Sequence, residues 1–207
     1  FADPQPMYEE MADQSVLIIE HRYSFEHSHF ADQSGIYNVG AMSFRRDEAG
    51  GECLNWWRDR CLEWCFARHD DGKFGDQKYL DDWPARFQRV VVLRHKGVGL
   101  APWNASRYRV TRTRQRFTVD GVDLVFFHFH GFVCFGPYVI RPCTQDYRPG
   151  VGAILDLYVH YAACLRHADR RARSVGVTVP EERPWTSRAN LRRALIQHDV
   201  VWAGPFL

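Results

Sequence analysis

The chain has 207 residues, of which 45% are hydrophobic and 25% are charged, and its formal net charge is +2 at pH 7. These proportions are typical of a soluble globular protein, and so small a net charge argues against a polyanionic partner such as nucleic acid. The length is enough for one large domain or for a domain with an appendage. The six cysteines form no CxxC motif and no regular framework. They therefore predict mostly buried thiols in a reducing, cytoplasmic setting.

No segment is predicted to cross a membrane. The longest apolar tract, residues 124–140, is interrupted by two His, two Gly and a Pro. No signal peptide is recognisable at the start of the sequence. The sequence begins with Phe1 rather than Met, so we expect the chain to be a fragment or a processed product.

The first part of the chain alternates apolar runs with segments of helical periodicity. The elements predicted here are, in chain order, a turn and short helix in residues 1–13, a buried strand in 15–21, a loop in 22–34, a Gly-interrupted strand in 35–44, an amphipathic helix in 48–70 and a shorter helix in 75–84. The long helix is expected to end near Asp70-Asp71-Gly72, and Pro84 is expected to stop the shorter one.

The second part begins with a Val-rich run and ends in helical patterns. Its predicted elements are a buried strand in 89–95, a Gly/Pro loop in 96–104, a hairpin in 107–130 that turns at Asp120-Gly121, a helix in 151–176, a linker in 174–186 and a last helix in 187–199 with Ser187 as N-cap. Strands and helices are mixed, which predicts the α/β class.

Two imidazoles end the apolar run VDLVFFHFHGF. His128 and His130 are two residues apart, so on a strand they point to the same side and could bind one metal ion. The alternative is a pair of hydrogen-bonded histidines in a core or cleft. No Asp or Glu follows within the next ten residues, so an acidic ligand would have to come from elsewhere, or the metal would be shared with phosphates of a ligand.

Three other short motifs carry polar groups or glycines at structurally sensitive places. Asp76 and Gln77 follow Gly75 at a predicted helix start, where they either cap the helix or point into a cleft. Asn38 and Gly40 interrupt an apolar strand, which indicates either a β-bulge or a close approach of a ligand. The two glycines of GVGLAPWN are only weakly similar to a phosphate-binding loop, because Pro102 stands where a helix would open.

Two further patterns favour ordinary structural roles. Cys61, Cys65 and His69 are spaced by one helical turn, but a zinc site would need a fourth ligand, so a buried ridge is favoured. The alternating arginines of residues 107–116 could contact a polyanion, but they fit the exposed face of a hairpin strand better.

The order of these motifs resembles a known family. FADPQPMYEE, YNVGAMSFRRD, GDQKYLDDW, APWN and HFHG follow one another as in the second half of a GT-A nucleotide-diphospho-sugar transferase. The chain is similar to bacterial glycosyltransferases and, more distantly, to the glycogenin and lipopolysaccharide galactosyltransferase group, over roughly residues 1–135. The resemblance implies a partial GT-A (Rossmann-like) mixed sheet flanked by helices in residues 1–147, the acceptor-side part of the domain. Residues 148–207 would then form a C-terminal helical extension.

The resemblance also implies an activity and a site. The expected activity is hexosyltransferase-like: metal-dependent transfer of a sugar from a nucleoside-diphosphate sugar to an unknown glycan, lipid or protein acceptor. The implied site residues are the catalytic Asp76 and Gln77, the substrate-binding Asn38, Gly40, Trp103 and Asn104, and the metal ligand His128. An imidazole together with carboxylate and phosphate oxygens suits Mn²⁺ or Mg²⁺, which would act as a Lewis acid on the leaving diphosphate. The Asp76 carboxylate would stabilise an oxocarbenium-like centre or orient a hydroxyl.

The chain departs from the family pattern in three ways. The Asp-x-Asp pair of the family is absent, and we expect it immediately upstream of Phe1. The family's Lys-Pro-Trp does not follow HFHG, which would leave Arg141 or the loop at Lys96 to meet the diphosphate. His95 precedes APWN at a spacing that makes it a rival to His128 as metal ligand. We therefore expect the 207 residues to be inactive alone on sugar nucleotides.

Two other function classes remain open at this stage. One is a metalloenzyme of another class that uses the His-x-His strand, such as a cupin-like oxygenase or a hydrolase. The other is a non-catalytic glycan-binding module. The Arg-rich faces of the two C-terminal helical segments are expected to be solvated surface.

Overall fold

The computed structural model describes residues 1–114, 116–135, 138–148, 150–177 and 200–204. The chain forms two compact units, Phe1–His128 and Phe129–Leu207. The first unit combines helices with several small sheets, and the second combines one long helix with short strands, so the chain is mixed α/β. The helix predicted for residues 187–199, with Ser187 as its cap, lies outside the described residues. The functional division predicted at residue 147 stays a prediction.

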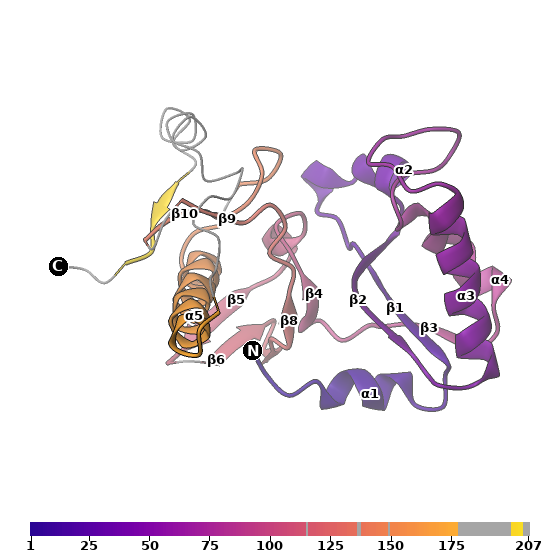
Figure 1. Cartoon of the computed structure of the whole chain (residues 1–207), viewed down its shortest axis with the longest axis horizontal. Coiled ribbons are helices and arrows are strands. Elements are labelled where there is room, and N and C mark those ends of the chain that lie inside the picture. The colour runs from indigo at the N-terminus through magenta and orange to yellow at the C-terminus, as the bar shows by residue number, and fades with distance from the viewer. Residues whose placement is uncertain (115, 136–137, 149, 178–199, 205–207) are drawn as a thin grey trace. The chain divides into compact units, whose positions relative to one another are not determined.

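A three-stranded sheet forms the centre of the first unit (Figure 1). Its strands are β1 (Val16–Glu20), β2 (Tyr37–Phe44) and β3 (Val90–Val92), in the order β2-β1-β3. The central strand β1 pairs antiparallel with β2 and parallel with β3. All four residues from Val16 to Ile19 are fully buried, because both faces of this strand are covered.

Helices cover one face of this sheet. Helix α3 (Glu48–Glu63) runs alongside it in Figure 1, and Cys53 packs with Val16 and Ile18 in one core cluster. Asp47 caps α3 by accepting a hydrogen bond from the Gly50 N–H at 2.9 Å. Leu80 and Trp83, from the 3₁₀ helix η2 (Lys78–Asp82) and helix α4 (Trp83–Arg86), complete this cluster.

The other face packs against helix α1 (Gln5–Met11) and strand β4 (Val98–Leu100). Their side chains Met11 and Val98 join Leu17 and Ile19 in a second core cluster. Strand β4 pairs in parallel with β8 (Phe126–Phe127). The remaining elements of this unit are η1 (Phe25–His27), α2 (Phe30–Ser34), η3 (Ala105–Arg107), β5 (Val110–Thr113), β6 (Arg116–Val119) and β7 (Val122–Asp123).

Several predicted elements differ from those observed. The loop predicted for residues 22–34 contains η1 and α2, and the predicted Gly/Pro loop 96–104 contains β4. Pro84 does not stop a helix but lies in the first turn of α4, where its missing N–H costs nothing. The single predicted hairpin is a three-stranded meander, of which the turn at Asp120-Gly121 is confirmed by positive φ at both residues.

Helix α3 is shorter than predicted. It ends at Glu63, and Trp64 already has extended backbone. The following residues form a turn in which Asp70 and Lys73 bridge, and the Phe66 carbonyl accepts the N–H of Gly75. The apolar periodicity of the sequence continues past Glu63, because Trp64 and Cys65 are apolar at helical spacing. The backbone hydrogen bonds of the turn nevertheless end the helix.

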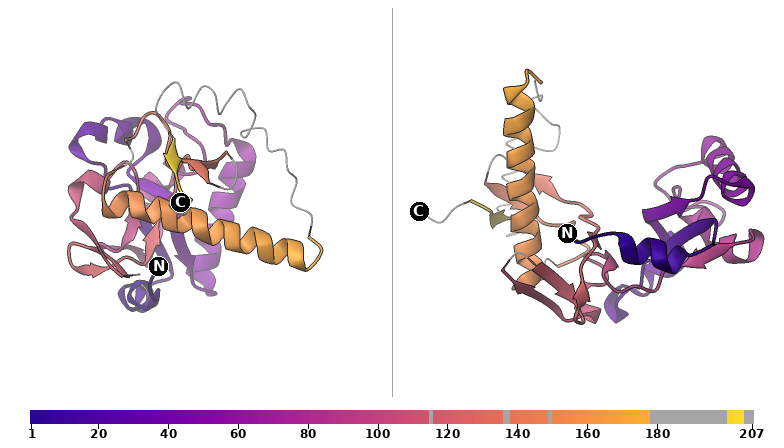
Figure 2. Two further views of the ribbon diagram at one scale, coloured as in Figure 1. Left: turned by 90° about the vertical axis from the view of Figure 1, so that its left-hand side faces the viewer. Right: turned by 90° about the horizontal axis from the view of Figure 1, so that it is seen from below.

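In the residues that the structure describes, the second unit contains one long helix. Helix α5 (Ala153–Ser174), which was predicted from its periodicity, is the long helix of Figure 2. It buries Leu157, Tyr158 and Ala162. The strands of this unit are β9 (Val133–Cys134), β10 (Val139–Arg141) and β11 (Val201–Trp202), in the order β11-β10-β9. Within the described residues, no helix has the length and apolar content that a membrane span requires. Of the six free cysteines only Cys53 and Cys143 are buried, so the prediction of mostly buried thiols was wrong.

Candidate functional site

The candidate site lies where β1 ends and β2 begins, on the face of the sheet that carries Ile19. Leu17 of β1 pairs with Ser43 of β2, and Ile19 pairs with Asn38. The segment of β2 between these two pairs is longer than the matching segment of β1, so β2 forms a bulge there. Such bulges are common beside functional sites because they turn side chains in new directions. The Asn38 Oδ1 accepts a hydrogen bond from the Gly40 N–H at 2.8 Å inside this bulge.

Gly40 makes room for His128. A Cβ added at Gly40 would lie 2.5 Å from the His128 Nδ1 and 2.7 Å from the Asn38 Oδ1, which no real side chain tolerates. The backbone of His128 is fixed by its N–H, which donates to the Leu100 carbonyl at 2.8 Å. His128 therefore meets two predicted site residues of β2, Asn38 and Gly40, that are far from it in the sequence.

Asn38 has hydrogen-bonding capacity that the protein does not use. Its side chain is buried, with 2% of the residue exposed, and its Oδ1 is bonded to Gly40. Among the residues that the structure describes, the Asn38 Nδ2 has no acceptor. A buried amide without an acceptor costs about 1–3 kcal/mol, which makes the Asn38 Nδ2 a candidate donor to a ligand.

Trp103 and Asn104 follow β4 and fasten it to β1. The Asn104 Nδ2 donates to the carbonyls of His21 at 2.8 Å and Gly99 at 3.0 Å, and its Oδ1 accepts the Ala101 N–H at 2.9 Å. The Trp103 Nε1 donates to the same His21 carbonyl at 2.8 Å. The Trp103 ring lies edge-on to His128, with centroids 5.1 Å apart. Asn104 has no exposed surface, and its three side-chain hydrogen bonds all go to backbone groups.

The glycines of the same segment pack the strands together. A Cβ at Gly97 would overlap the Asp123 carbonyl oxygen, and one at Gly99 would lie 3.1 Å from the Ile19 side chain. Gly99 also has a φ of +84°, which favours glycine. These contacts explain both glycines by close strand packing.

His21 is a buried residue of this site that the sequence did not single out. It is 3% exposed, and its ring stacks on Tyr23 with centroids 4.5 Å apart and lies edge-on to Trp103 at 5.4 Å. Burial lowers the pKa of His21 to about 4, although the carbonyls of Ile36 and Gly35 and the Asp81 carboxylate raise it, and His128 lowers it further. The ring is therefore neutral at pH 7. The available signal was its place directly after a buried strand, at an edge of the sheet where ligands often bind.

Asp76 and Asp81, two of the three acidic residues of GDQKYLDDW, lie in different surroundings. Asp81 contributes to the electrostatics of His21, and its Oδ1 accepts the Ile36 N–H at 2.7 Å. Asp76, by contrast, acts electrostatically on Cys61 of α3, and its carbonyl accepts the Trp57 Nε1–H at 2.9 Å. Gln77 donates its side-chain N–H to the Ser34 carbonyl at 2.8 Å. Asp81 is thus the carboxylate that acts on the His21 imidazole, whereas Asp76 and Gln77 are held by α3 and α2.

The other histidines considered as ligands lie in separate settings. The His95 N–H donates to the Glu10 carboxylate at 3.0 Å in the connection between β3 and β4. His130 belongs to the second unit, where its ring lies edge-on to Tyr147 at 5.8 Å. Burial lowers the pKa of His130, while Asp146 raises it. Strand β8 ends at Phe127, so the predicted continuous strand through both histidines was wrong.

The described side chains around His128 do not by themselves form a complete site for a divalent metal. Within the described ranges, no three His, Cys, Asp or Glu side chains converge as a metal site. Cys65 and His69 lie beyond the end of α3, so they do not continue a helical ridge with Cys61. His128, seated against Gly40, could contribute one imidazole to a metal site, and any further ligands would have to come from elsewhere.

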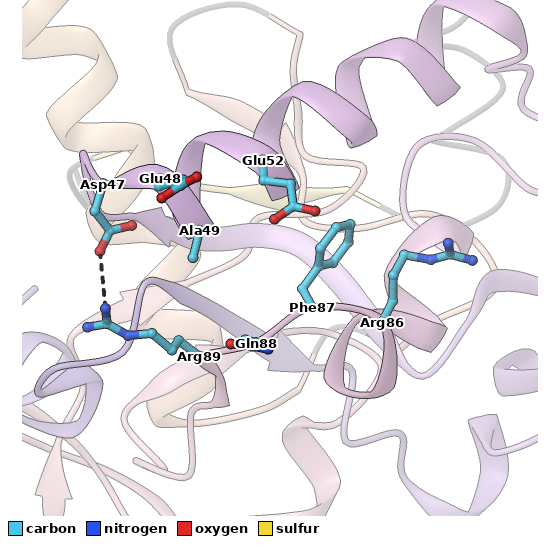
Figure 3. Close-up of a pocket in the computed structure, with 8 residues that line it drawn as sticks. All are labelled: Asp47, Glu48, Ala49, Glu52, Arg86, Phe87, Gln88 and Arg89. Carbon is cyan, nitrogen blue, oxygen red and sulfur yellow. Dashed lines mark ion pairs between the residues drawn. The ribbon is translucent and has the colours of Figure 1, made fainter.

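A separate cavity of about 460 Å³ lies at the start of α3 (Figure 3). Its lining is mainly charged, and the Arg89 guanidinium lies 3.8 Å from the Asp47 carboxylate. A second hollow, of about 750 Å³, lies along β3 and is lined by Glu10, Glu20 and Arg22 among others. Neither contains a predicted site residue, so the candidate site rests on side-chain chemistry rather than on the depth of a cavity.

Comparison with known proteins finds two relatives in Bacillus subtilis (strain 168). The chain is 34% identical over 165 residues to YfnF, described as an uncharacterized protein; the match covers 76% of this chain and 54% of YfnF. It is 31% identical over 134 residues to YfnD, also described as uncharacterized, with 64% of this chain and 43% of YfnD covered. The chain thus spans about half the length of the curated relatives it matches. No protein-family model matches the chain, and no solved structure matches it at a significant level.

Proposed function

We propose that the chain is the acceptor-side part of a metal-dependent glycosyltransferase with a GT-A fold, which transfers a sugar from a nucleoside-diphosphate sugar. The observation that supports this most strongly is the meeting of Asn38, Gly40 and His128. The three residues come from two separate motifs of the resemblance, and a Cβ at Gly40 would collide with both of the other side chains.

In this proposal His128 contributes an imidazole ligand to Mn²⁺ or Mg²⁺. When bound, the ion would supply Lewis-acid stabilisation of the leaving diphosphate. The contact with Gly40 and the Leu100 hydrogen bond fix the imidazole, so little orientation would be lost on binding. The Asn38 Nδ2 donates to the donor sugar, and Trp103 excludes water from one side of His128.

The reaction centre is assigned to Asp76 and Gln77, as the resemblance implies. Asp81 is a competing candidate, because its carboxylate acts on His21 in the same site. The two can be separated by mutation. Asp76→Asn is expected to lower the transfer rate by about 100-fold or more, as for loss of a positioned acid–base or electrostatic group. Asp81→Asn keeps an oxygen that can accept the Ile36 N–H and is expected to have a smaller effect.

The test is a screen of nucleoside-diphosphate sugars with Mn²⁺ or Mg²⁺, with product detected by mass spectrometry. The chain alone is expected to be inactive, and the longer gene product to which we expect it to belong is expected to be active. His128→Ala in the active protein should abolish transfer while circular dichroism shows an intact fold. The matched control is His69→Ala, which removes an exposed imidazole beyond the end of α3 and should change nothing.

Wild-type activity in His128→Ala would refute the metal assignment. Metal-independent transfer would do the same. Stoichiometric iron or zinc in the isolated chain would instead favour a metalloenzyme of another class. Sugar binding without turnover by the longer protein would favour a glycan-binding module.

A further inference from the structure

Strand β3 forms one edge of the central sheet, and among the described strands it pairs only with β1. The Arg89 carbonyl accepts an N–H of β1 at 3.0 Å, and the Leu93 N–H donates to a β1 carbonyl at 2.9 Å. Alternate residues of a strand direct their backbone N–H and C=O to the same side. The backbone groups of Val90 and Val92 therefore face away from β1, at the open edge.

The outward groups of this edge are free. In the part of the chain that the structure describes, no hydrogen bond is made by the backbone N–H or C=O of Val90 or Val92 on that side. The hollow of about 750 Å³ lies beside them and is lined by residues 90–94. A row of β-branched residues with unpaired backbone groups is a segment that pairs readily with another strand. The edge of β3 is therefore suited to dock an extended backbone.

The open edge is limited to the three valines of β3. At its C-terminal end, the Glu10 carboxylate accepts the N–H groups of Arg94 and His95, so these donors are not available to a partner. At its N-terminal end, Arg89 has a φ of +60°, which turns the chain out of the line of the strand. A partner strand can therefore pair with Val90–Val92 alone, and this restricts its register.

This short edge is complementary to itself. When two copies pair antiparallel about a twofold axis at Val91, Val90 of each copy lies opposite Val92 of the other. Each such pair exchanges hydrogen bonds in both directions, so every outward N–H and C=O of the edge obtains a partner. The two Val91 side chains then lie directly opposite each other on one face of the joined sheet.

The charges at the two ends of β3 are also complementary. Glu10 and Glu20 line the hollow at the C-terminal end of the strand. Arg89 lies at the N-terminal end, and 46% of its side chain is exposed. Antiparallel pairing places the N-terminal end of one strand beside the C-terminal end of the other. Arg89 of each copy would thus face the carboxylates of the second copy.

Two arginines lie at the acidic end as well, and neither opposes this pairing. The Arg22 guanidinium donates to three backbone carbonyls between residues 93 and 98, so it is held by its own chain. Arg94 is exposed and, by the alternation of the strand, lies on the face of the sheet that α3 covers. On that face the second copy carries the carboxylates that line the cavity of Figure 3, which are Asp47, Glu48 and Glu52.

We propose that the edge of β3 is a dimerisation surface through which two copies of the chain join their central sheets. The joined sheet would have the strand order β2-β1-β3-β3-β1-β2, with the twofold axis between the two β3 strands. The proposal does not depend on glycosyl transfer, because it uses only backbone groups and charges of the first unit.

Sedimentation equilibrium of the 207-residue chain tests the dimer. The mass is expected to rise with concentration to twice that of the monomer. Val92→Pro removes an outward N–H and breaks no bond to β1, and proline is tolerated on edge strands. It should raise the dissociation constant at least about tenfold, since the symmetric interface loses this donor twice. Val92→Thr keeps the N–H and the β-branched shape, so this matched control should dimerise like the wild type.

Val91→Cys tests the register. Val91 would face its own copy in a non-hydrogen-bonded pair, whose Cα atoms lie roughly 4.5 Å apart, within reach of a disulfide. With the exposed Cys65 and Cys164 replaced by Ser, mild oxidation by copper phenanthroline in air should link two copies. Val90→Cys is the control, because it would face Val92 rather than itself, and it should cross-link at least about tenfold more slowly.

A chain that stays monomeric at every concentration would overturn the proposal. A dimer that is unchanged by Val92→Pro, or that cross-links equally through Val90→Cys and Val91→Cys, would place the interface elsewhere. If circular dichroism shows that Val92→Pro does not fold, the cross-linking comparison decides alone. A longer protein that is monomeric, and whose Val90 and Val92 amides are protected from hydrogen exchange, would show that its own backbone fills the edge. That result would also overturn the assignment to a second copy.

Discussion

Two buried asparagines of the same site have opposite hydrogen-bonding states. Asn104, in the turn after β4, uses both side-chain atoms in three bonds to backbone groups of β1 and β4. Asn38, in the bulge of β2, uses only Oδ1 and leaves Nδ2 without an acceptor in the described part of the chain. Both were expected to bind substrate. The difference teaches that burial alone does not separate a residue that builds a site from one that serves a ligand.

The same contrast extends to their surroundings. Near Asn104 the backbone is also held by Trp103, whose Nε1–H donates to the same His21 carbonyl as Asn104. Around Asn38 the backbone of β2 carries no side chain at Gly40, and His128 occupies that space. Stability should therefore depend on the first region and ligand binding on the second.

Asn104→Ala tests the region around Asn104 and should have the largest effect on the free energy of unfolding. It removes three hydrogen bonds from a fully buried position, and we expect the free energy of unfolding to fall by about 3–5 kcal/mol. Urea unfolding measures this change. Asn55→Ala is the control, since Asn55 is exposed on α3 and should change stability by less than about 0.5 kcal/mol. A similar small change at Asn104 would remove its structural assignment.

His21, whose carbonyl accepts a hydrogen bond from Asn104, is neutral. Its burial makes the free energy of unfolding depend on pH. Its pKa is about 4 in the folded protein and 6.5 in a free side chain, so the unfolded state binds more protons between these values. Stability is therefore complete above about pH 6.5 and falls as the pH drops towards 4. At about 1.4 kcal/mol per unit, the full loss is about 3 kcal/mol.

The measurement is thermal or urea unfolding across this pH range in the wild type and in His21→Phe. The variant should lack the part of the slope that His21 contributes. Parallel slopes in the two proteins would show that the pKa of His21 is not lowered by burial in this site.

Gly40→Ala tests the region around Asn38 by adding a side-chain atom where His128 packs. The added Cβ must displace the imidazole of His128 or the Asn38 amide, and overpacking of this kind costs about 1–3 kcal/mol. Gly51→Ala is the matched control, because a Cβ there meets nothing within 4 Å and Gly51 lies inside α3. It should stabilise the protein by about 0.5–1 kcal/mol. Equal behaviour of the two variants in unfolding experiments would contradict the contact between Gly40 and His128.

Asn38→Ala should have the smallest effect on stability. It loses the bond to Gly40 but also removes a buried donor that lacks an acceptor, so the two changes nearly cancel to within about 1 kcal/mol. Differential scanning calorimetry measures this. A loss as large as that of Asn104→Ala would mean that both asparagines are structural and that the contrast between them is wrong.

The sequence predicted some parts of this protein well and others poorly. Strands β1 and β2 and helix α5 follow from apolar runs and periodicity, because burial dictates those patterns. The end of α3 was missed, because the backbone bonds after Glu63 leave no periodic signal. His21 and Asp81 were missed for a similar reason: a single polar residue has no pattern, and its partners Ile36 and Trp103 are distant in sequence.

The sequence by itself determined the mixed α/β content, the order of the motifs and the residue types available for a site. Only the tertiary structure decided which of these residues meet. It brought His128 onto Gly40, joined Asn104 to the end of β1 and left Asn38 with an unused donor. The physical reason is that hydrogen-bond satisfaction and steric fit depend on groups many residues apart, which no local pattern records.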